Sequence, residues 1–309
     1  MIPSGRELAE YTLARQHPVT RTWLDDAARL ENLSAMHEGT EVELAADPGI
    51  AAARIAKMAP GTPVRSMLNH WVQVRADQCA MFSMRFEGMD PSKPFVDAST
   101  LSRALEVGDL AGLAAAAVEH YAVHKPSYLR LWSSQPVGAI AGTEPDRRFL
   151  AAPIEVLRVG EVPAGLALTP ATDLRHYEDA QAAYDAVDRA HPRHVEQASI
   201  SSRDELQESA DEGLLFNVEV DGVWAGYSAA LDGGEDTLGL SAYVVRDVIL
   251  APGFRGRGLG ASVSTLLARA LPDQSRVLIG TIHANNKGAL HAATQSGRQD
   301  VGGWLTYPL

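Results

Sequence analysis

The amino-acid sequence predicts an α/β protein: a mixed, mostly antiparallel sheet flanked by helices and preceded by a second α/β domain. Runs with strand-like and helix-like spacing of apolar residues alternate from about residue 165 to the end of the 309-residue chain. Asp221 and Gly222 stand between two strand-like runs, a pair that is typical of tight hairpins. A glycine-rich turn at residues 255–260 follows one strand-like run and opens a helix-like run. Together these features predict the fold class.

The length of the chain predicts two domains of roughly 150 residues each. The segment from Val159 to Gly165 contains two glycines and a proline, and it interrupts the regular periodicity. We therefore expect a boundary there, with an N-terminal α/β domain at residues 1–160 and a second domain at residues 161–309.

The second domain is the more readable part of the chain. Ser202 is a good N-cap followed by acidic residues, and it predicts a helix that runs to about Asp211. Another helix opens near Asn286, and the glycine-rich turn starts a third. The remaining elements are a helix at 171–190, which stops before His191 and Pro192, and strands at 166–170, 214–220, 223–231, 240–250, 276–282 and 301–307.

The N-terminal half gives weaker signals. It predicts strands at 66–74, 79–86 and 128–132 and a helix at 101–123. Residues 84–91 echo residues 245–252, because in each a strand-like run ends in a residue-x-Pro step. If the echo is real, a helix and another strand follow in both copies, and the N-terminal half is a degenerate repeat; chance similarity is the other explanation.

Composition excludes several classes of protein. The net charge of −12 argues against non-specific binding to nucleic acid, which depends on Lys and Arg. Cys79 is the single cysteine, so no intrachain disulfide and no cysteine-based zinc site can form, and we expect no metal. The chain starts without the basic-then-apolar order of a signal peptide, and its longest apolar run, 110–118, is too short to span a bilayer. We expect a cytoplasmic protein without a membrane partner. The excess of 23 Arg over 4 Lys is typical of GC-rich bacterial genomes.

The glycine-rich turn carries the chemistry. Consecutive backbone N–H groups at such a turn, beside a helix N-terminus, form a cradle for phosphate oxygens. Gly256, Gly258 and Ala261 also fit a loose dinucleotide-binding spacing, but the preceding strand comes after an antiparallel hairpin and does not open a βαβ unit. No Gly-Lys-Ser/Thr follows, which excludes a Walker A loop. A turn that simply starts a helix is the structural alternative.

Two blocks in this half resemble the GNAT superfamily of acyl-CoA N-acyltransferases. Arg255, Gly258 and Gly260 match its Arg/Gln-x-x-Gly-x-Gly/Ala signature. Asn286 to Ala289, followed by Gly297, is similar to its Asn-x-x-Ala helix with a terminal glycine. The resemblance covers the second domain only and implies a GNAT-type sheet there; a degenerate first half would make the chain a tandem GNAT protein.

The resemblance implies acetyl-CoA as the cofactor. The backbone of the turn would then hold the pyrophosphate, and the preceding strand would splay from its neighbour and pair with the pantetheine. The N–H of Leu250 would donate to the thioester carbonyl, and Asn286 would reach the cofactor from its helix. The residues concerned are Val248, Ile249 and Leu250 on the strand, Arg255, Gly256, Arg257, Gly258, Leu259 and Gly260 in the turn, and Asn286.

Acyl transfer to an amine requires a base. Asp247 lies on the right strand, with a solvated or salt-bridged residue as the alternative, and His283 is a second candidate. Many family members carry a tyrosine seven residues after the helix asparagine as the general acid, but this chain has Ala293 there. Tyr307 or a water is the expected substitute, and His291 lies on the same helix. Arg298 replaces the family's usual aromatic after Gly297.

The predicted function is therefore acetyl-CoA-dependent N-acetyltransfer to a primary amine, by direct attack in a ternary complex. The acceptor, a small molecule or a peptide, would sit where residues 171–212 and the loop 232–236 meet the splayed strands. Asp232, Glu235 and Asp236 could attract a cation there, with a merely solvated acidic turn as the alternative. The N-terminal domain would line one side of the acceptor site or form a homodimer contact. The alternatives are a non-catalytic acyl-CoA sensor or assembly module and the transfer of a longer acyl group.

Overall fold

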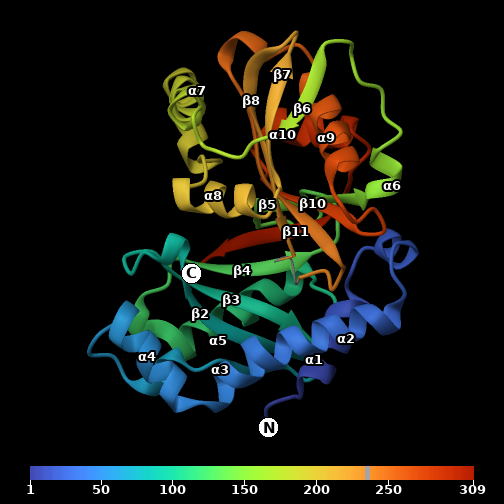
Figure 1. Cartoon of the computed structure of the whole chain (residues 1–309). Coiled ribbons are helices and arrows are strands. Elements are labelled where there is room, and N and C mark those ends of the chain that lie inside the picture. The colour runs from blue at the N-terminus through green and yellow to red at the C-terminus, as the bar shows by residue number, and fades with distance from the viewer. Residues whose placement is uncertain (234–236) are drawn as a thin grey trace. The chain divides into compact units, whose positions relative to one another are not determined.

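The computed structural model describes residues 1–233 and 237–309, and the chain folds into two compact units (Figure 1). Unit 1 consists of Met1–Asp146, a short segment that ends at Gly239, and Val301–Leu309. Unit 2 consists of the stretch that begins at Arg147 and of Leu240–Asp300. The sequence-based division into residues 1–160 and 161–309 differs from these units and stays a prediction about domain boundaries.

Unit 1 is a sheet with helices. Its strand order is β1-β2-β3-β4-β11, in which β3 and β4 are parallel and the other printed pairs are antiparallel. The apolar core lies between this sheet and its helices and includes Phe82, Leu113 and Leu131. The elements are α1 (Gly5–Ala14), α2 (Asp26–His37), α3 (Glu43–Ala46), α4 (Pro48–Met58), β1 (His70–Arg75), β2 (Gln78–Phe86), β3 (Pro94–Leu101), α5 (Leu110–Tyr121), β4 (Tyr128–Ser133) and β11 (Gln299–Pro308).

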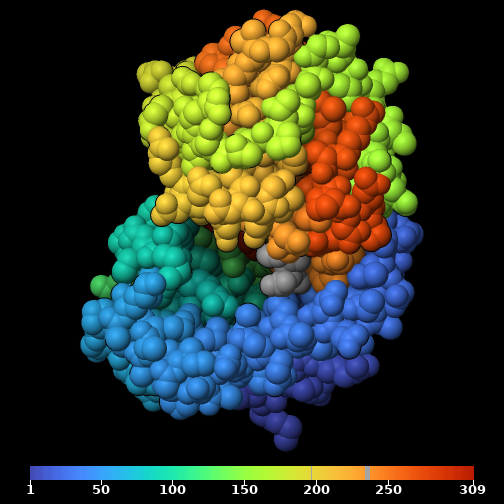
Figure 2. All heavy atoms as spheres, viewed as in Figure 1, coloured from blue at the N-terminus to red at the C-terminus, as the bar shows by residue number. Residues whose placement is uncertain are grey.

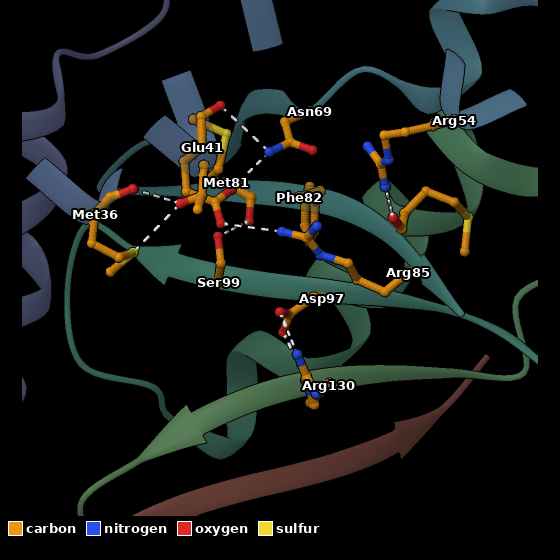
Figure 3. A network of polar contacts seen from close by, with 12 residues as sticks. Met36, Glu41, Arg54, Asn69, Met81, Phe82, Arg85, Asp97, Ser99 and Arg130 are labelled. Atoms are coloured by element: carbon orange, nitrogen blue, oxygen red, sulfur yellow. Dashed lines mark hydrogen bonds and ion pairs between the residues drawn. The ribbon is translucent and has the colours of Figure 1, made fainter. Parts of the chain in front are cut away.

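Two carboxylates in the sheet of unit 1 face arginines (Figure 3). The carboxylate of Glu41 accepts a hydrogen bond from Asn69 Nδ2 at 2.8 Å and lies 3.6 Å from Arg85 Nη2. Burial raises the pKa of Glu41, although Arg85 opposes the shift. On the adjacent strands, Asp97 accepts hydrogen bonds from Arg130 Nη2 at 2.7 Å and Nε at 3.1 Å. Both carboxylates are thus paired with arginines of their own unit.

Unit 2 has the strand order β5-β10-β9-β8-β7-β6, antiparallel except for the parallel pair β9 and β10. Ile249 of β9 packs with residues of α7 and α8, whereas Val248 and Leu250 pack with residues of α9, so helices cover both faces. Figure 2 shows α7 and α8 in yellow-green to gold and the α9 region in orange on the visible side of this unit. The elements are β5 (Glu144–Pro153), α6 (Ile154–Leu157), β6 (Leu166–Pro170), α7 (Tyr177–Ala190), α8 (Arg203–Asp211), β7 (Leu215–Val220), β8 (Val223–Asp232), β9 (Ala242–Leu250), α9 (Leu259–Ala270), β10 (Val277–His283) and α10 (Lys287–Gln295).

The two units exchange a strand. In each unit a strand, a helix and a parallel strand follow one another, as β3-α5-β4 and as β9-α9-β10. The next strand along the chain then pairs in the other unit: β5 follows β4 but pairs with β10, and β11 follows α10 but pairs with β4. The repeated order agrees with a tandem arrangement of two related halves.

The predicted fold class, a mixed and mostly antiparallel sheet with flanking helices and an N-terminal α/β region, is confirmed. The Asp221–Gly222 turn forms with both residues at positive φ, 52° and 76°. Ser202 caps α8, because its Oγ accepts a hydrogen bond from the N–H of Glu205. The strands and helices predicted for residues 161–309 are all present, most with shifted ends, and the last of them, β11, belongs to unit 1.

The N-terminal predictions need correction. The helix expected at 101–123 covers only Leu110–Tyr121, because Pro94–Leu101 is a strand that the sequence did not signal. The echo between 84–91 and 245–252 was wrong in its detail: β2 ends at Phe86 and turns into β3, and the helix follows β3. The strand equivalent to β9 in unit 1 is therefore β3. Helices α1, α2 and α4 were not predicted.

Candidate functional site

The strands β9 and β10 separate part of the way along their length. Their last parallel pair is Val244 with Ile279, so that Val245 and Gly280 are the first residues of an opening. On its other edge β9 continues to pair with β8 as far as Leu250. A register shift leaves Arg246 as an extra residue on β9, a bulge that increases the local bend. The splay that the resemblance implies is therefore present.

Two backbone groups of β9 face this opening. The N–H of Ala251 donates to Ala225 on the β8 side, at 2.8 Å. Because ladder hydrogen bonds alternate along an antiparallel strand, the N–H groups of Leu250 and Val248 point to the opposite edge, toward the opening. The N–H of Ile249 points to β8 by the same alternation, and its side chain is buried. The structure thus leaves Val248 and Leu250 free to pair with a ligand and gives Ile249 no such role.

The glycine-rich turn leads directly from β9 into α9. Gly256 and Gly258 have φ of 72° and 74°, which favours glycine at both positions. A Cβ at either position would meet nothing within 4 Å, so the backbone is open on that side. Gly258 is the N-cap of α9, and no side chain caps this helix. Its first N–H groups are therefore available to an anion.

Gly260 and Arg255 have structural roles beside the ones predicted. A Cβ at Gly260 would lie 2.9 Å from the Cβ of Ala292, so the glycine lets α9 and α10 approach closely. The Arg255 guanidinium donates to Leu250 O at 2.6 Å and to Ala183 O at 2.9 Å, and burial lowers its pKa. The side chain of Arg255 thus fixes the turn against α7 and does not project toward a phosphate, whereas Arg257 is exposed.

Asp247 is the buried acid of the site, with 4% of its surface exposed. Burial raises the pKa of its carboxyl group to about 6, opposed by hydrogen bonds from the N–H of Ser201 and the hydroxyl of Tyr184. These bonds measure 3.3 Å to Oδ2 and 3.4 Å to Oδ1, respectively. A carboxylate that is ionised at neutral pH and has a raised pKa is suited to accept a proton.

These features line one cleft that lies within unit 2. Its volume is about 1680 Å³, larger than the roughly 300–1,000 Å³ of a site for a single small ligand. The space is therefore sufficient for a cofactor and an acceptor together. The lining includes Tyr184, His194, Asp247, Val248, Leu250, Gly256, Gly258, Leu259, Gly260, His283, Asn286, His291 and Arg298.

A family comparison agrees with this geometry. Residues 177–297 match the model of the Acetyltransferase (GNAT) family. They form a GNAT domain.

Several solved structures are similar to the chain. One is an acetyltransferase from the GNAT family of Colwellia psychrerythraea, with 12% identity, a TM-score of 0.42, and coverage of 60% of this chain and 65% of that chain. A GCN5-related N-acetyltransferase from Kribbella flavida has 14% identity, a TM-score of 0.46 and coverage of 85% and 95%. A tandem GNAT protein from the clavulanic acid biosynthesis pathway has 15% identity, a TM-score of 0.38 and coverage of 92% and 95%. A search of curated proteins gave no match.

The other predicted cofactor and base residues of the GNAT domain also border the cleft. Asn286 caps α10, with its Oδ1 accepting from the N–H of Ala289 at 3.1 Å, so this oxygen is already used. His283 ends β10, and its Nδ1 lies 3.1 Å from the N–H of Asn285. Both side chains lie on the β10–α10 side, whereas Asp247 packs toward α7. The structure thus keeps His283 as a candidate base and gives Asp247 the more protected environment.

The position of the missing tyrosine is a buried one. Ala293 is fully buried, and it is the neighbouring residues His291 and Ala292 that line the cleft of the GNAT domain. Tyr307, predicted as a substitute acid, belongs to β11 in unit 1, where it packs against the core cluster of that unit. It is not among the residues that line the cleft. We therefore do not assign Tyr307 a catalytic role.

Sequence reasoning missed Tyr184 as a site residue. The sequence predicts it only as a residue within the helix at 171–190, yet its hydroxyl donates to Asp247. Behind it, the ring of His194 lies 5.8 Å from that of Tyr184, and His194 Nδ1 pairs with Asp188 at 2.6 Å. A tyrosine on the buried face of the helix was the available signal, because its hydroxyl needs a partner there.

The acidic loop gives no support to the predicted amine attraction. Asp232 pairs with Arg276 Nη1 at 2.6 Å, so its charge is already balanced. Glu235 and Asp236 lie outside the described residues. Within residues 1–233 and 237–309, no three His, Cys, Asp or Glu side chains are placed to hold a metal ion. None of the helices in those ranges is long and apolar enough to cross a membrane.

Proposed function

We propose that the GNAT domain transfers the acyl group of a CoA thioester to a primary amine, by direct attack in a ternary complex. Acetyl-CoA is the usual donor in the family and the first donor to test. The observation that carries the proposal is the joint opening of β9 and the α9 N-terminus into one cleft that also contains Asp247.

The residues present fit a CoA ester. The uncapped first turn of α9 and the open backbone at Gly256 and Gly258 would bind the pyrophosphate. The outward N–H groups of Val248 and Leu250 would pair with the pantetheine arm as a neighbouring strand would. Val248 and Leu250 also pack with Leu259 and Val263, which gives the arm an apolar wall.

The direction of the arm follows from these two contacts. The phosphate end is fixed at the turn after the C-terminal end of β9, so the arm runs back along the strand toward the bulge at Arg246. The thioester then lies farther from the turn than the phosphates do. Of the two outward N–H groups, that of Val248 is closer to the bulge, and we assign it the contact with the thioester carbonyl in place of the predicted Leu250.

Asp247 supplies the base. Its carboxylate accepts a proton from the ammonium group of the acceptor, directly or through a water, which frees the nitrogen lone pair. The nitrogen forms the amide bond with the acyl carbon as the carbon–sulfur bond breaks. The nitrogen loses its second proton to water, and the leaving thiolate takes a proton from water in turn, which is feasible because an ordinary thiol has a pKa near 8.5. The general acid that the family's tyrosine supplies, and that Ala293 cannot, is then not required for the reaction.

The test has two stages. Thermal unfolding with CoA and acetyl-CoA measures cofactor binding, and release of free thiol with a panel of primary amines measures turnover. We expect both CoA and acetyl-CoA to raise the melting temperature and at least one amine to release thiol. The absence of any thermal shift would defeat the proposal. Binding without turnover on any amine would favour the non-catalytic acyl-CoA sensor.

A further inference from the structure

Arg298 is a buried cation at the apex of the opening between β9 and β10. It follows Gly297 at the end of α10 and has 5% of its surface exposed. Its Nη2 donates to Ser264 Oγ on α9 at 3.2 Å. A Cβ at Gly280 would lie 2.6 Å from its Nη1 and 3.8 Å from the Cβ of Val245. The guanidinium therefore lies beside Gly280, the first residue of the opening on β10.

This cation has no carboxylate partner among the described residues. Its Nε and Nη1 are buried and make no hydrogen bond there. Burial lowers the pKa of Arg298 to about 10, so the guanidinium stays charged at neutral pH. Arg148, the other fully buried arginine of unit 2, differs: its Nε and Nη2 bond to Asp300 at 2.7 to 3.1 Å. A buried charge without a counterion is unfavourable, so binding of an anion beside Arg298 would be stabilising.

The cleft supplies the access. Arg298 lines it together with Val245, Ser264 and Gly280. The glycine at 280 leaves space beside the guanidinium that any other side chain would fill. From Leu250 to Val245 the strand covers roughly 16 Å, so an arm that starts at the α9 turn and runs back along β9 ends near this point. The acyl group of the donor would thus be the part of the ligand closest to Arg298.

We propose that the acyl donor is a CoA ester whose acyl chain ends in a carboxylate, and that Arg298 is the residue that selects it. This inference rests on the proposed function. The planar guanidinium keeps unused N–H groups at Nε and Nη1, which suit a carboxylate better than the methyl group of an acetyl chain. The transfer itself is unchanged: the amide bond forms, the carbon–sulfur bond breaks, and the distal carboxylate stays bound at Arg298.

The experiment compares succinyl-CoA with butyryl-CoA, which has a four-carbon chain without the carboxylate. Isothermal titration of the full chain should show at least tenfold tighter binding of succinyl-CoA. In Arg298→Met, which keeps an unbranched side chain without the charge, the preference should disappear while the affinity for free CoA changes less than twofold. Arg298→Lys keeps the charge and should keep part of the preference.

Arg147→Met is the matched control, because Arg147 also lines the cleft but lies on β5 opposite His283. It should affect both esters equally if the selection belongs to Arg298. Equal affinity of the wild-type protein for the two esters would overturn the proposal without any variant. A preference that survives in Arg298→Met, or that appears for carboxylate-bearing amines in place of donors, would also overturn it. If neither ester nor free CoA binds, the proposed function itself has failed.

Discussion

The two units start an equivalent helix in opposite ways. In each, a 12-residue helix connects the two parallel strands of the sheet, α5 in unit 1 and α9 in unit 2. At the start of α5, the buried carboxylate of Asp109 accepts hydrogen bonds from Arg103 at 2.8 and 2.9 Å and from the N–H of Glu106 at 2.9 Å. At the start of α9, Gly258 offers no side chain and leaves the N–H groups open. One helix start contains its own anion, and the other has room for an external one.

Arg298 of unit 2 differs from two arginines of unit 1 in its partners. In unit 1, the half-buried Arg85 and Arg130 face the carboxylates of Glu41 and Asp97. In unit 2, Arg298 has no such partner among the described residues. The two units therefore share a strand-helix-strand order without sharing a site. The difference lies in the side chains: those of unit 1 pair with one another, whereas Arg298 in unit 2 is left for a ligand.

The largest expected effect comes from closing the open helix start. Gly258→Glu places a carboxylate where the phosphates of CoA would bind, and we expect more than 100-fold weaker binding and loss of the CoA-induced thermal shift. Gly213→Glu is the matched control, since Gly213 has a similar φ of 72°, open space around it and no place in the cleft. It should keep the CoA-induced shift. An undiminished shift in Gly258→Glu would show that the anion binds elsewhere.

The second largest effect is expected from removing the proposed general base of unit 2, Asp247. Asp247→Asn should lower kcat/KM by about 10²–10⁴-fold with little change in CoA affinity. In the wild-type protein, kcat/KM should rise with pH through about 6, because the base must be ionised. His283→Gln tests the other candidate base in the same assay. A large loss in His283→Gln with none in Asp247→Asn would reverse the assignment.

The same substitution has a predictable effect on stability. The folded state raises the pKa of Asp247 from 3.8 to about 6, so it favours the neutral carboxyl. The stabilisation of the folded state by the neutral carboxyl is fully present below pH 3.8 and is lost as the pH rises through 6. Asp247→Asn should therefore be more stable than the wild type at pH 8, by about 1–3 kcal/mol, and the gap should close toward pH 4. Urea unfolding at the two pH values measures it, and a gap that widens at low pH would contradict the sign.

A smaller effect is expected from removing the carboxylate at the start of α5 in unit 1. Burial alone would raise the pKa of Asp109, but the hydrogen bonds from Arg103 and Glu106 outweigh it and hold the pKa below its usual value. Asp109→Asn should cost about 1–3 kcal/mol of unfolding free energy at neutral pH, with less loss as the pH falls through the lowered pKa.

Asp77→Asn is the control for this substitution. Asp77 pairs with the same Arg103 but is 69% exposed, so we expect a change below about 0.5 kcal/mol. Both variants should bind CoA as the wild type does. Weaker CoA binding in Asp109→Asn, without loss of stability, would mean that the start of α5 contributes to the cofactor site.

The sequence was most informative where local signals and function coincide. The glycine positions in 255–260, the Asp221–Gly222 hairpin and the Ser202 cap each depend on neighbours within a few residues, so their geometry could be predicted. The acid at Asp247 was placed on the correct strand. Its burial could not be foreseen, because it depends on contacts with Tyr184 and Ser201 from a distant helix and loop.

Other features depend on long-range pairing and escaped prediction. Pro94–Leu101 is a strand because β2 and β4 pair with it, although its own composition is weak. The exchange of β5 and β11 depends on which unit offers an edge, and no local pattern encodes that choice. Arg298 was noted only as a departure from a family pattern. Its position at the opening between β9 and β10 depends on packing against Gly280 and Ser264, which are distant in sequence.

The smallest effect is expected from removing the Tyr184 hydroxyl, which the sequence analysis did not assign to the site. The hydrogen bond from Tyr184 lowers the pKa of Asp247, so Tyr184→Phe should raise that pKa further above 6. The rising limb of kcat/KM should then move to higher pH by a few tenths of a unit, roughly a twofold loss at pH 6 with little at pH 8. Tyr177→Phe is the control on the same helix, because its hydroxyl donates to Ser201 O and not to Asp247. A uniform tenfold loss at every pH, with an unmoved limb, would instead identify Tyr184 as the proton donor to the thiolate. The function of the tyrosine absent at Ala293 would then have moved from α10 to α7.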